Sequence, residues 1–284
     1  MNFLTGEEFS SQKLEELLDL AAKLKKERGH LDHAQILKGK HLAMLFEKPS
    51  LRTRFSFAVA MFELGGTVIE SVAQNRKQED PEDLARVLSG YCNGIMIRTH
   101  DHNNLLRMAK VSSIPIINAL SEGHHPCQIL ADLLTLKEKF RQLKGLKLAY
   151  IGDGNNILNS LLLLAPRVGV EVHYCCPVGH EPKVHLGVRH DSPENAVANA
   201  HAVYTDVWES MGFEDSVNLE LFAGFQVNEK LMERALPEAV FMHCMPMNRG
   251  QEVSLTLPDS KQSVIFQQSE NRLHVQKALL MSLL

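Results

Sequence analysis

The sequence predicts an α/β protein with two doubly wound parallel-sheet domains joined by interdomain helices. Three observations predict this fold class. The chain has 284 residues, more than the roughly 100–200 residues of a typical single core. Short apolar runs alternate with helical patterns along the whole chain, as in parallel sheets covered by helices. The composition, 44% hydrophobic and 23% charged, is that of an ordinary globular protein.

The first half begins with an amphipathic helical pattern over 11–28, followed by an alternating series. The apolar runs typical of strands lie at 41–46, 67–71, 94–98 and 115–119, and helical patterns lie between them at 52–64, 81–91 and 103–110. Pro, Gly and Ser residues end these segments. A long helical pattern at 128–143 then leads into the second half.

The second half repeats the alternation. It has strand-like runs at 147–151, 171–175, 202–205 and 240–243, a helical pattern at 156–168, and a final amphipathic pattern at 271–284. We expect a first domain at 1–130, to which a C-terminal helix at 268–284 returns, and a second domain at 131–267. Between Pro182 and Asn199 the sequence predicts only a loop.

Charge and cysteine content narrow the function class. With 30 Lys and Arg against 34 Asp and Glu, the net charge is -4, so no basic surface is expected for nucleic acid. The five cysteines show no CxxC spacing and are typical of reduced thiols in a cytoplasmic protein. No stretch approaches the roughly 20 apolar residues of a membrane span, and no signal peptide is evident.

The segment from Ser50 through Arg52 and Thr53 to Arg54 follows a strand and begins a helix. Backbone N–H groups, two hydroxyls and two guanidiniums therefore converge at the positive end of a helix dipole. The alternative is an N-capped helix with a solvated basic turn. A phosphate-like ligand is favoured, because cations at this end oppose the dipole unless an anion is bound.

Other polar side chains follow strands, at the edge where α/β sheets bind ligands. Arg98 ends one strand, where a ligand contact and a surface ion pair are equally good interpretations. His125 and Gln128 begin the linking helix, where a contact with a small polar ligand and a capped helix start are equally good interpretations. In the second half, Asp206 suits a substrate ammonium group or caps a turn, and Cys244 offers a thiol. Its neighbour His243 is expected on the opposite strand face, and so not to act as its base directly.

Cofactor and metal sites are not expected. The turn at 152–156 resembles a dinucleotide fingerprint, but Ile157 occupies the place of its third glycine. That disfavours a nicotinamide oxidoreductase, and no GxxxxGK[ST] loop is present. No pair of Cys or His residues has zinc-ligand spacing.

Taken together and in this order, these segments resemble the ornithine carbamoyltransferases of the aspartate/ornithine carbamoyltransferase family over nearly the whole chain. The matching segments are 46–54, Arg98, 125–128, 153–156, 206–212, 243–246 and 271–272. The DxWxSMG pattern at 206–212 and the HCxP pattern at 243–246 point to ornithine rather than aspartate as the acceptor.

The resemblance implies transfer of a carbamoyl group from carbamoyl phosphate to the side-chain amine of L-ornithine, giving L-citrulline and phosphate without a cofactor. It implies carbamoyl phosphate binding by Ser50, the Leu51 backbone, Arg52, Thr53, Arg98, His125, Gln128, the Met245 backbone and Arg272. It implies ornithine binding by Asn156, Asp206, Ser210 and Met211, and catalytic roles for Cys244, Arg98, His125 and Asp206. It also implies a homo-oligomer, at least a trimer, with active sites at subunit interfaces.

The chain departs from the family pattern in places. Leu51 stands where Thr is usual, Met245 stands where Leu is usual, and the 182–199 segment lacks an additional helix. The loop at 71–80 occupies the place of one that reaches a neighbouring subunit, and its Gln74, Arg76 and Lys77 have no assigned roles. Two alternatives remain: a carbamoyltransferase for N-acetylornithine, N-succinylornithine or putrescine, and a non-catalytic homologue acting as a binding subunit.

Overall fold

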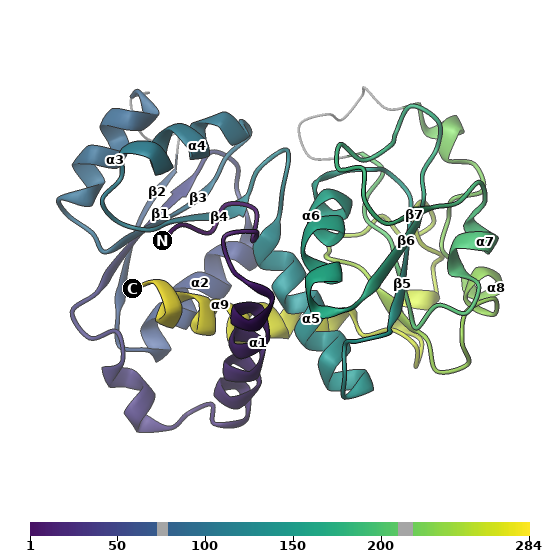
Figure 1. Cartoon of the computed structure of the whole chain (residues 1–284), viewed down its shortest axis with the longest axis horizontal. Helices are drawn as coiled ribbons and strands as arrows, with labels where there is room; N and C mark the ends of the chain where they lie inside the picture. The colour runs from purple at the N-terminus through teal and green to yellow at the C-terminus, as the bar shows by residue number, and fades with distance from the viewer. Residues whose placement is uncertain (73–78, 210–217) are drawn as a thin grey trace. The chain divides into compact units, whose positions relative to one another are not determined.

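The computed structural model describes residues 1–72, 79–209 and 218–284. The chain divides into two compact units (Figure 1). Unit 1 comprises residues 1–134 and 270–284, and unit 2 comprises residues 135–269. Two long helices, α5 (Pro126–Phe140) and α9 (Ile265–Leu283), carry the chain from one unit to the other.

Unit 1 contains a four-stranded parallel sheet in the order β2-β1-β3-β4. Its strands are β1 (His41–Phe46), β2 (Thr67–Val72), β3 (Gly94–Arg98) and β4 (Ile116–Leu120). The central strand β3 is buried along its whole length, as expected for a sheet covered on both faces. At the carboxyl edge, Phe46 is in register with Arg98, so the segments that follow β1 and β3 begin side by side.

Helices cover both faces of this sheet. They are α1 (Ser11–Lys26), α2 (Leu51–Glu63), α3 (Pro81–Ser89) and α4 (His102–Val111), with a short 3-10 helix at Leu31–Gln35. Figure 1 shows α3 and α4 on one face of the unit 1 sheet and α2 and the end of α9 on the other. Ala85, Leu105 and Met108 of α3 and α4 pack on Leu45 and Ile95 of the strands, so apolar burial fixes this layer.

Unit 2 contains a five-stranded parallel sheet in the order β7-β6-β5-β8-β9. Its strands are β5 (Lys147–Ile151), β6 (Glu171–Cys175), β7 (Val188–Arg189), β8 (Ala202–Tyr204) and β9 (Val240–Met242). The α-helices are α6 (Asn156–Leu164), α7 (Pro193–Val197) and α8 (Glu229–Met232), with 3-10 turns at Ala165–Val168, Leu219–Phe222 and Leu257–Asp259. Two parallel sheets interleaved with helices confirm the predicted fold class.

The expectation of only loop between residues 182 and 199 is wrong. This segment forms β7 at the edge of the sheet and the short helix α7. Ser192 caps α7 by accepting a hydrogen bond from the Asn195 N–H (3.3 Å), and Pro193 is its first residue. A Ser-Pro-Glu sequence is a helix-start signal, and burial of Ala196 and Val197 in the unit 2 core anchors the short helix.

Some helix ends also differ from the sequence expectation. The last helix begins at Ile265 rather than at 271, and the helical stretch at 156–168 tightens to 3-10 geometry after Leu164. Within the described residues, no helix combines the length and the apolar character needed to cross a membrane. None of the five cysteines, all of which the structure describes, forms a disulfide bond.

Candidate active site

The first turn of α2 follows the carboxyl end of β1. Ser50 is its N-cap, and the Ser50 Oγ accepts a hydrogen bond from the Thr53 N–H (3.3 Å). Leu51, the first residue of α2, is 70% exposed, and its backbone N–H is one of the donors at the start of the helix. Thr53 is buried, and its hydroxyl faces inward into unit 1.

Arg272 of α9 lies at the centre of a polar cluster in unit 1. Its guanidinium is buried, donates through Nη2 to Thr53 Oγ1 (2.8 Å), and donates through Nη1 to Gln128 Oε1. Nη1 also lies 3.4 Å from His125 Nε2. Gln128 in turn donates to Asp132 Oδ1 (2.9 Å), one helical turn along α5. These contacts turn the Gln128 carbonyl oxygen toward Arg272.

Burial and the neighbouring positive charges favour the neutral form of the His125 imidazole. Burial, reinforced by the charges of Arg272, Arg98 and Arg52, holds its pKa well below the ordinary value. A guanidinium can only donate, so His125 Nε2 accepts from Arg272 and the ring proton resides on Nδ1. The cluster therefore combines guanidinium groups, which suit a phosphate dianion, with a neutral N–H donor.

In unit 2, Asp206 and Cys244 follow the neighbouring strands β8 and β9. The carboxylate of Asp206 is buried; its Oδ1 accepts from Cys244 Sγ (3.0 Å) and its Oδ2 accepts from Asn155 Nδ2 (2.8 Å). Asn155 is also the N-cap of α6, where its Oδ1 accepts from the Ile157 N–H (3.0 Å). One side chain thus ties the start of α6 to Asp206.

His243 does not face away from Cys244 as the strand pattern predicted. β9 ends at Met242, so the alternation of side chains no longer applies at 243 and 244. A carboxylate oxygen of Asp206, a ring nitrogen of His243 and Sγ of Cys244 lie within 4.8 Å of one another, close enough to be considered as metal ligands. However, His243 Nδ1 accepts from the Met245 N–H (2.9 Å), and its Nε2 lies 3.2 Å from Glu252 Oε1. Both ring nitrogens are engaged, which fits a hydrogen-bonded network better than a metal site.

Of the remaining predicted residues, the structure describes Asn156 and Met245 but not the others. Asn156 is the first residue of α6 in unit 2, and the Met245 N–H is used within its own loop. Ser210 and Met211 lie outside the described residues, as do Gln74, Arg76 and Lys77.

Sequence reasoning missed three polar residues that hold the predicted ones in place. Asn155, Asp132 and Glu252 contact Asp206, Gln128 and His243 respectively. Asn at a helix N-cap and Asp four residues after Gln on a helix are readable signals. Burial of Glu252 beside His243 depends on the tertiary fold.

Two models of one protein family match nearly the whole chain. Residues 1–138 match the model described as "Aspartate/ornithine carbamoyltransferase, carbamoyl-P binding domain", and residues 144–283 match its "Asp/Orn binding domain". The chain belongs to the aspartate/ornithine carbamoyltransferase family. Arg272 falls in the second match, yet the structure places it in unit 1 beside His125.

Individual carbamoyltransferases are similar over their full length. The ornithine carbamoyltransferase of Methanocorpusculum labreanum is 44% identical over 301 aligned positions, covering 100% of this chain and 98% of that protein. That of Anoxybacillus flavithermus is 46% identical, covering 100% and 96%.

Solved structures of carbamoyltransferases agree with the fold. The enzyme from Thermus thermophilus aligns with a TM-score of 0.91 at 43% identity, covering 97% of this chain and 96% of that one. The enzyme from Pyrococcus furiosus aligns with a TM-score of 0.92 at 40% identity, covering 100% and 96%. An N-acetyl-L-ornithine transcarbamylase also aligns, with a TM-score of 0.88 at 29% identity over 100% of both chains.

Proposed function

We propose that this chain transfers the carbamoyl group of carbamoyl phosphate to the side-chain amine of L-ornithine, giving L-citrulline and phosphate. The observation that carries the proposal is full-length similarity, at 42–46% identity, to proteins named ornithine carbamoyltransferase. The site residues support it, because the chain keeps the chemical groups that both substrates require.

The unit 1 cluster is suited to carbamoyl phosphate. Arg52, Arg98 and Arg272 all act on the electrostatics of His125, so their charges converge where a phosphate dianion would bind. As an amine attacks the carbonyl carbon, negative charge develops on the carbonyl oxygen. A neutral imidazole N–H and the Thr53 hydroxyl are donors that stabilise such an oxyanion. The C–O bond to phosphate then breaks, and phosphate leaves.

The unit 2 cluster is suited to the amino acid. Asp206 presents a buried carboxylate for an ammonium group, with Cys244 donating to its Oδ1 and Asn155 donating to its Oδ2. The side-chain amine of ornithine resembles that of lysine, with an ordinary pKa of about 10.4, and must lose a proton to attack. In this proposal Asp206 and Cys244 orient the amine and assist that loss, and the departing phosphate is the final proton acceptor.

The trimer and the cytoplasmic location are finer parts of the same proposal. Leu51, Phe55 and Phe62 share one face of α2 and are 70%, 61% and 62% exposed, and Ile69 on the edge strand β2 is 58% exposed. Residues spaced four and seven apart lie on one side of a helix. Several large apolar side chains exposed together on one face of a folded unit are typical of a subunit interface.

The experiment that tests the proposed function offers carbamoyl phosphate to the purified full-length chain with four acceptors in parallel. These are L-ornithine, N-acetyl-L-ornithine, putrescine and L-aspartate, and the readout is the carbamoylated product. We expect L-ornithine to react with kcat/KM at least roughly 100-fold above each other amine. Preference for another acceptor would overturn the substrate assignment. No product with any of the four would support the non-catalytic alternative.

A further inference from the structure

The segment that follows β6 packs closely against the turn that follows β5. The Gly154 N–H donates to the His180 carbonyl oxygen (2.8 Å). A Cβ atom at position 154 would lie 2.3 Å from the backbone nitrogen of Pro182, so only glycine allows this approach. The position of His180 relative to the turn at 152–155 is therefore fixed through the backbone.

The imidazole of His180 also contacts this turn. Its Nδ1 lies 2.8 Å from Asp153 Oδ1, and the two side chains are 23% and 19% exposed. Burial raises the pKa of Asp153 and the nearby Asp206 raises it further, whereas the hydrogen bond and charge of His180 lower it. His180 thus favours an ionised, oriented Asp153 beside a second carboxylate.

The same turn leads to Asp206. The Tyr150 hydroxyl donates to the Asp153 carbonyl oxygen (2.9 Å) and lies 3.3 Å from Asn155 Oδ1. Asn155 donates to Asp206 Oδ2 (2.8 Å). A displacement of Asp153 would reach the Asp206 carboxylate through these three partly buried contacts.

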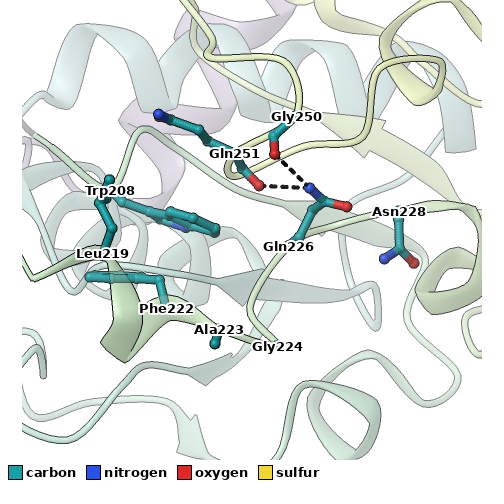
Figure 2. A pocket seen from close by; sticks show the side chains of 9 residues that line it. All are labelled: Trp208, Leu219, Phe222, Ala223, Gly224, Gln226, Asn228, Gly250 and Gln251. Carbon is teal, nitrogen blue, oxygen red and sulfur yellow. Dashed lines mark hydrogen bonds between the residues drawn. The ribbon is translucent and has the colours of Figure 1, made fainter.

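A second route runs through aromatic rings. The His180 ring meets Phe222 edge-on with centroids 4.9 Å apart, and Phe222 stacks on Trp208 at 5.1 Å. Figure 2 shows the Trp208 and Phe222 rings together at one side of an open cavity of about 400 Å³. Trp208 is two residues after Asp206, so the ring of His180 supports the segment that carries the carboxylate.

We propose that His180 is a positioning residue for the acceptor amino acid: it holds the 153–155 turn and the Trp208 segment so that Asp206 is oriented toward the substrate ammonium group. His180 acts through these neighbours rather than by touching the substrate. The inference rests on the proposed function and deepens it, because it predicts an effect on ornithine and not on carbamoyl phosphate.

Two variants separate the two routes. His180→Phe keeps an aromatic ring against Phe222 but loses the bond to Asp153, and His180→Asn keeps an N–H donor near the place of Nδ1. His185→Asn, at an exposed position in the same loop, is the matched control. Initial rates are measured with each substrate varied, together with thermal unfolding.

We expect His180→Phe to raise the KM for ornithine about tenfold, the effect of one charge-assisted hydrogen bond, with the KM for carbamoyl phosphate within about twofold. The KM of His180→Asn for ornithine should lie much closer to that of wild type than to that of His180→Phe, because this variant keeps a donor for Asp153. Trp208 is the only tryptophan in the chain, so its fluorescence reports on the stack: the emission maximum shifts in His180→Asn and stays in His180→Phe.

The inference is overturned if His180→Phe leaves the ornithine KM within about twofold of wild type, or if both KM values rise together. Restoration by His180→Asn distinguishes positioning from a folding defect. The wild-type chain is assayed first with ornithine. Its inactivity would overturn the proposed function itself, whereas an active wild type with an unaffected His180→Phe variant overturns only this inference.

Discussion

Replacement of Arg272 by methionine tests the unit 1 cluster most directly. The buried guanidinium donates to Thr53 and Gln128 and lies beside His125. Methionine keeps an unbranched chain but removes the charge and all of its donors. A lost interaction between a charged donor and phosphate is worth about 1.5–3 kcal/mol. We therefore expect kcat/KM for carbamoyl phosphate to fall roughly 100-fold, or about 2.7 kcal/mol.

The pH profile gives the same variant a second signature. Arg272 is, after burial, the largest cause that lowers the pKa of His125. Without it, that pKa rises toward its ordinary value, so His125 takes up a proton at higher pH and the acid limb of kcat/KM moves upward. Arg272→Lys keeps the positive charge, so the acid limb of its kcat/KM profile should stay close to that of wild type. The simultaneous hydrogen bonds of the two guanidinium nitrogens to Gln128 and Thr53 are lost in this variant.

Stability should change little. The loss of the hydrogen bonds to Thr53, Gln128 and His125 is opposed by relief of a buried cation that lies among other arginines, so the net change is about 1 kcal/mol or less. In a chain of this size that corresponds to a shift of about 2–4 °C in Tm. Arg234→Met, at an exposed position of unit 2, is the control. A kcat/KM for carbamoyl phosphate within about twofold of wild type in Arg272→Met would refute the assignment of Arg272.

Three further predictions concern other parts of the chain. Asp206→Asn should raise the ornithine KM at least roughly tenfold through loss of a buried charge partner, in steady-state assays, with no such change for carbamoyl phosphate. His274→Phe should flatten the acid loss of stability: burial, with Lys25 and Lys277 nearby, lowers the folded pKa from 6.5 to about 4. Through this group the free energy of unfolding of wild type therefore falls by about 2 kcal/mol between pH 8 and pH 5. Urea unfolding of the variant should lack this part of the loss. Phe62→Glu should lower the mass measured by light scattering, whereas Tyr91→Glu, at another exposed aromatic, should not; an unchanged mass for the first would contradict the interface.

The sign of the His274 effect follows from proton linkage. Below pH 6.5 the unfolded chain binds a proton at this side chain, whereas the folded chain does not until about pH 4. Proton binding therefore stabilises the unfolded state relative to the folded state as the pH falls below 6.5. This penalty on folding is absent only above the unfolded pKa. If the variant and wild type lose equal stability between pH 8 and pH 5, then His274 is not the group responsible.

The local pattern of the sequence determined the alternation of strands and helices. The segments 41–46 and 171–175 coincide with β1 and β6 to the residue. β1 is a short apolar run that is buried after its first residue, whereas β6 alternates exposed or half-buried polar residues, Glu171 and His173, with buried ones. The Ser50 cap and the turn at 152–156 were also predictable, since capping and turn chemistry act over a few residues. The Ser192 signal was present as well, but a five-residue helix is too short for periodicity to reveal.

Only the tertiary structure decided which side chains meet. Arg272 and Thr53 are 219 positions apart in the chain, and Asp206 and Asn155 are 51 apart, so no local pattern could pair them. The same holds for the approach of His180 to Asp153, which depends on a glycine at 154 and on the packing of two loops. Local sequence preferences determine the helices and strands. Packing between residues far apart in the sequence determines which polar side chains are buried together, and therefore their hydrogen bonds and the direction of their pKa shifts.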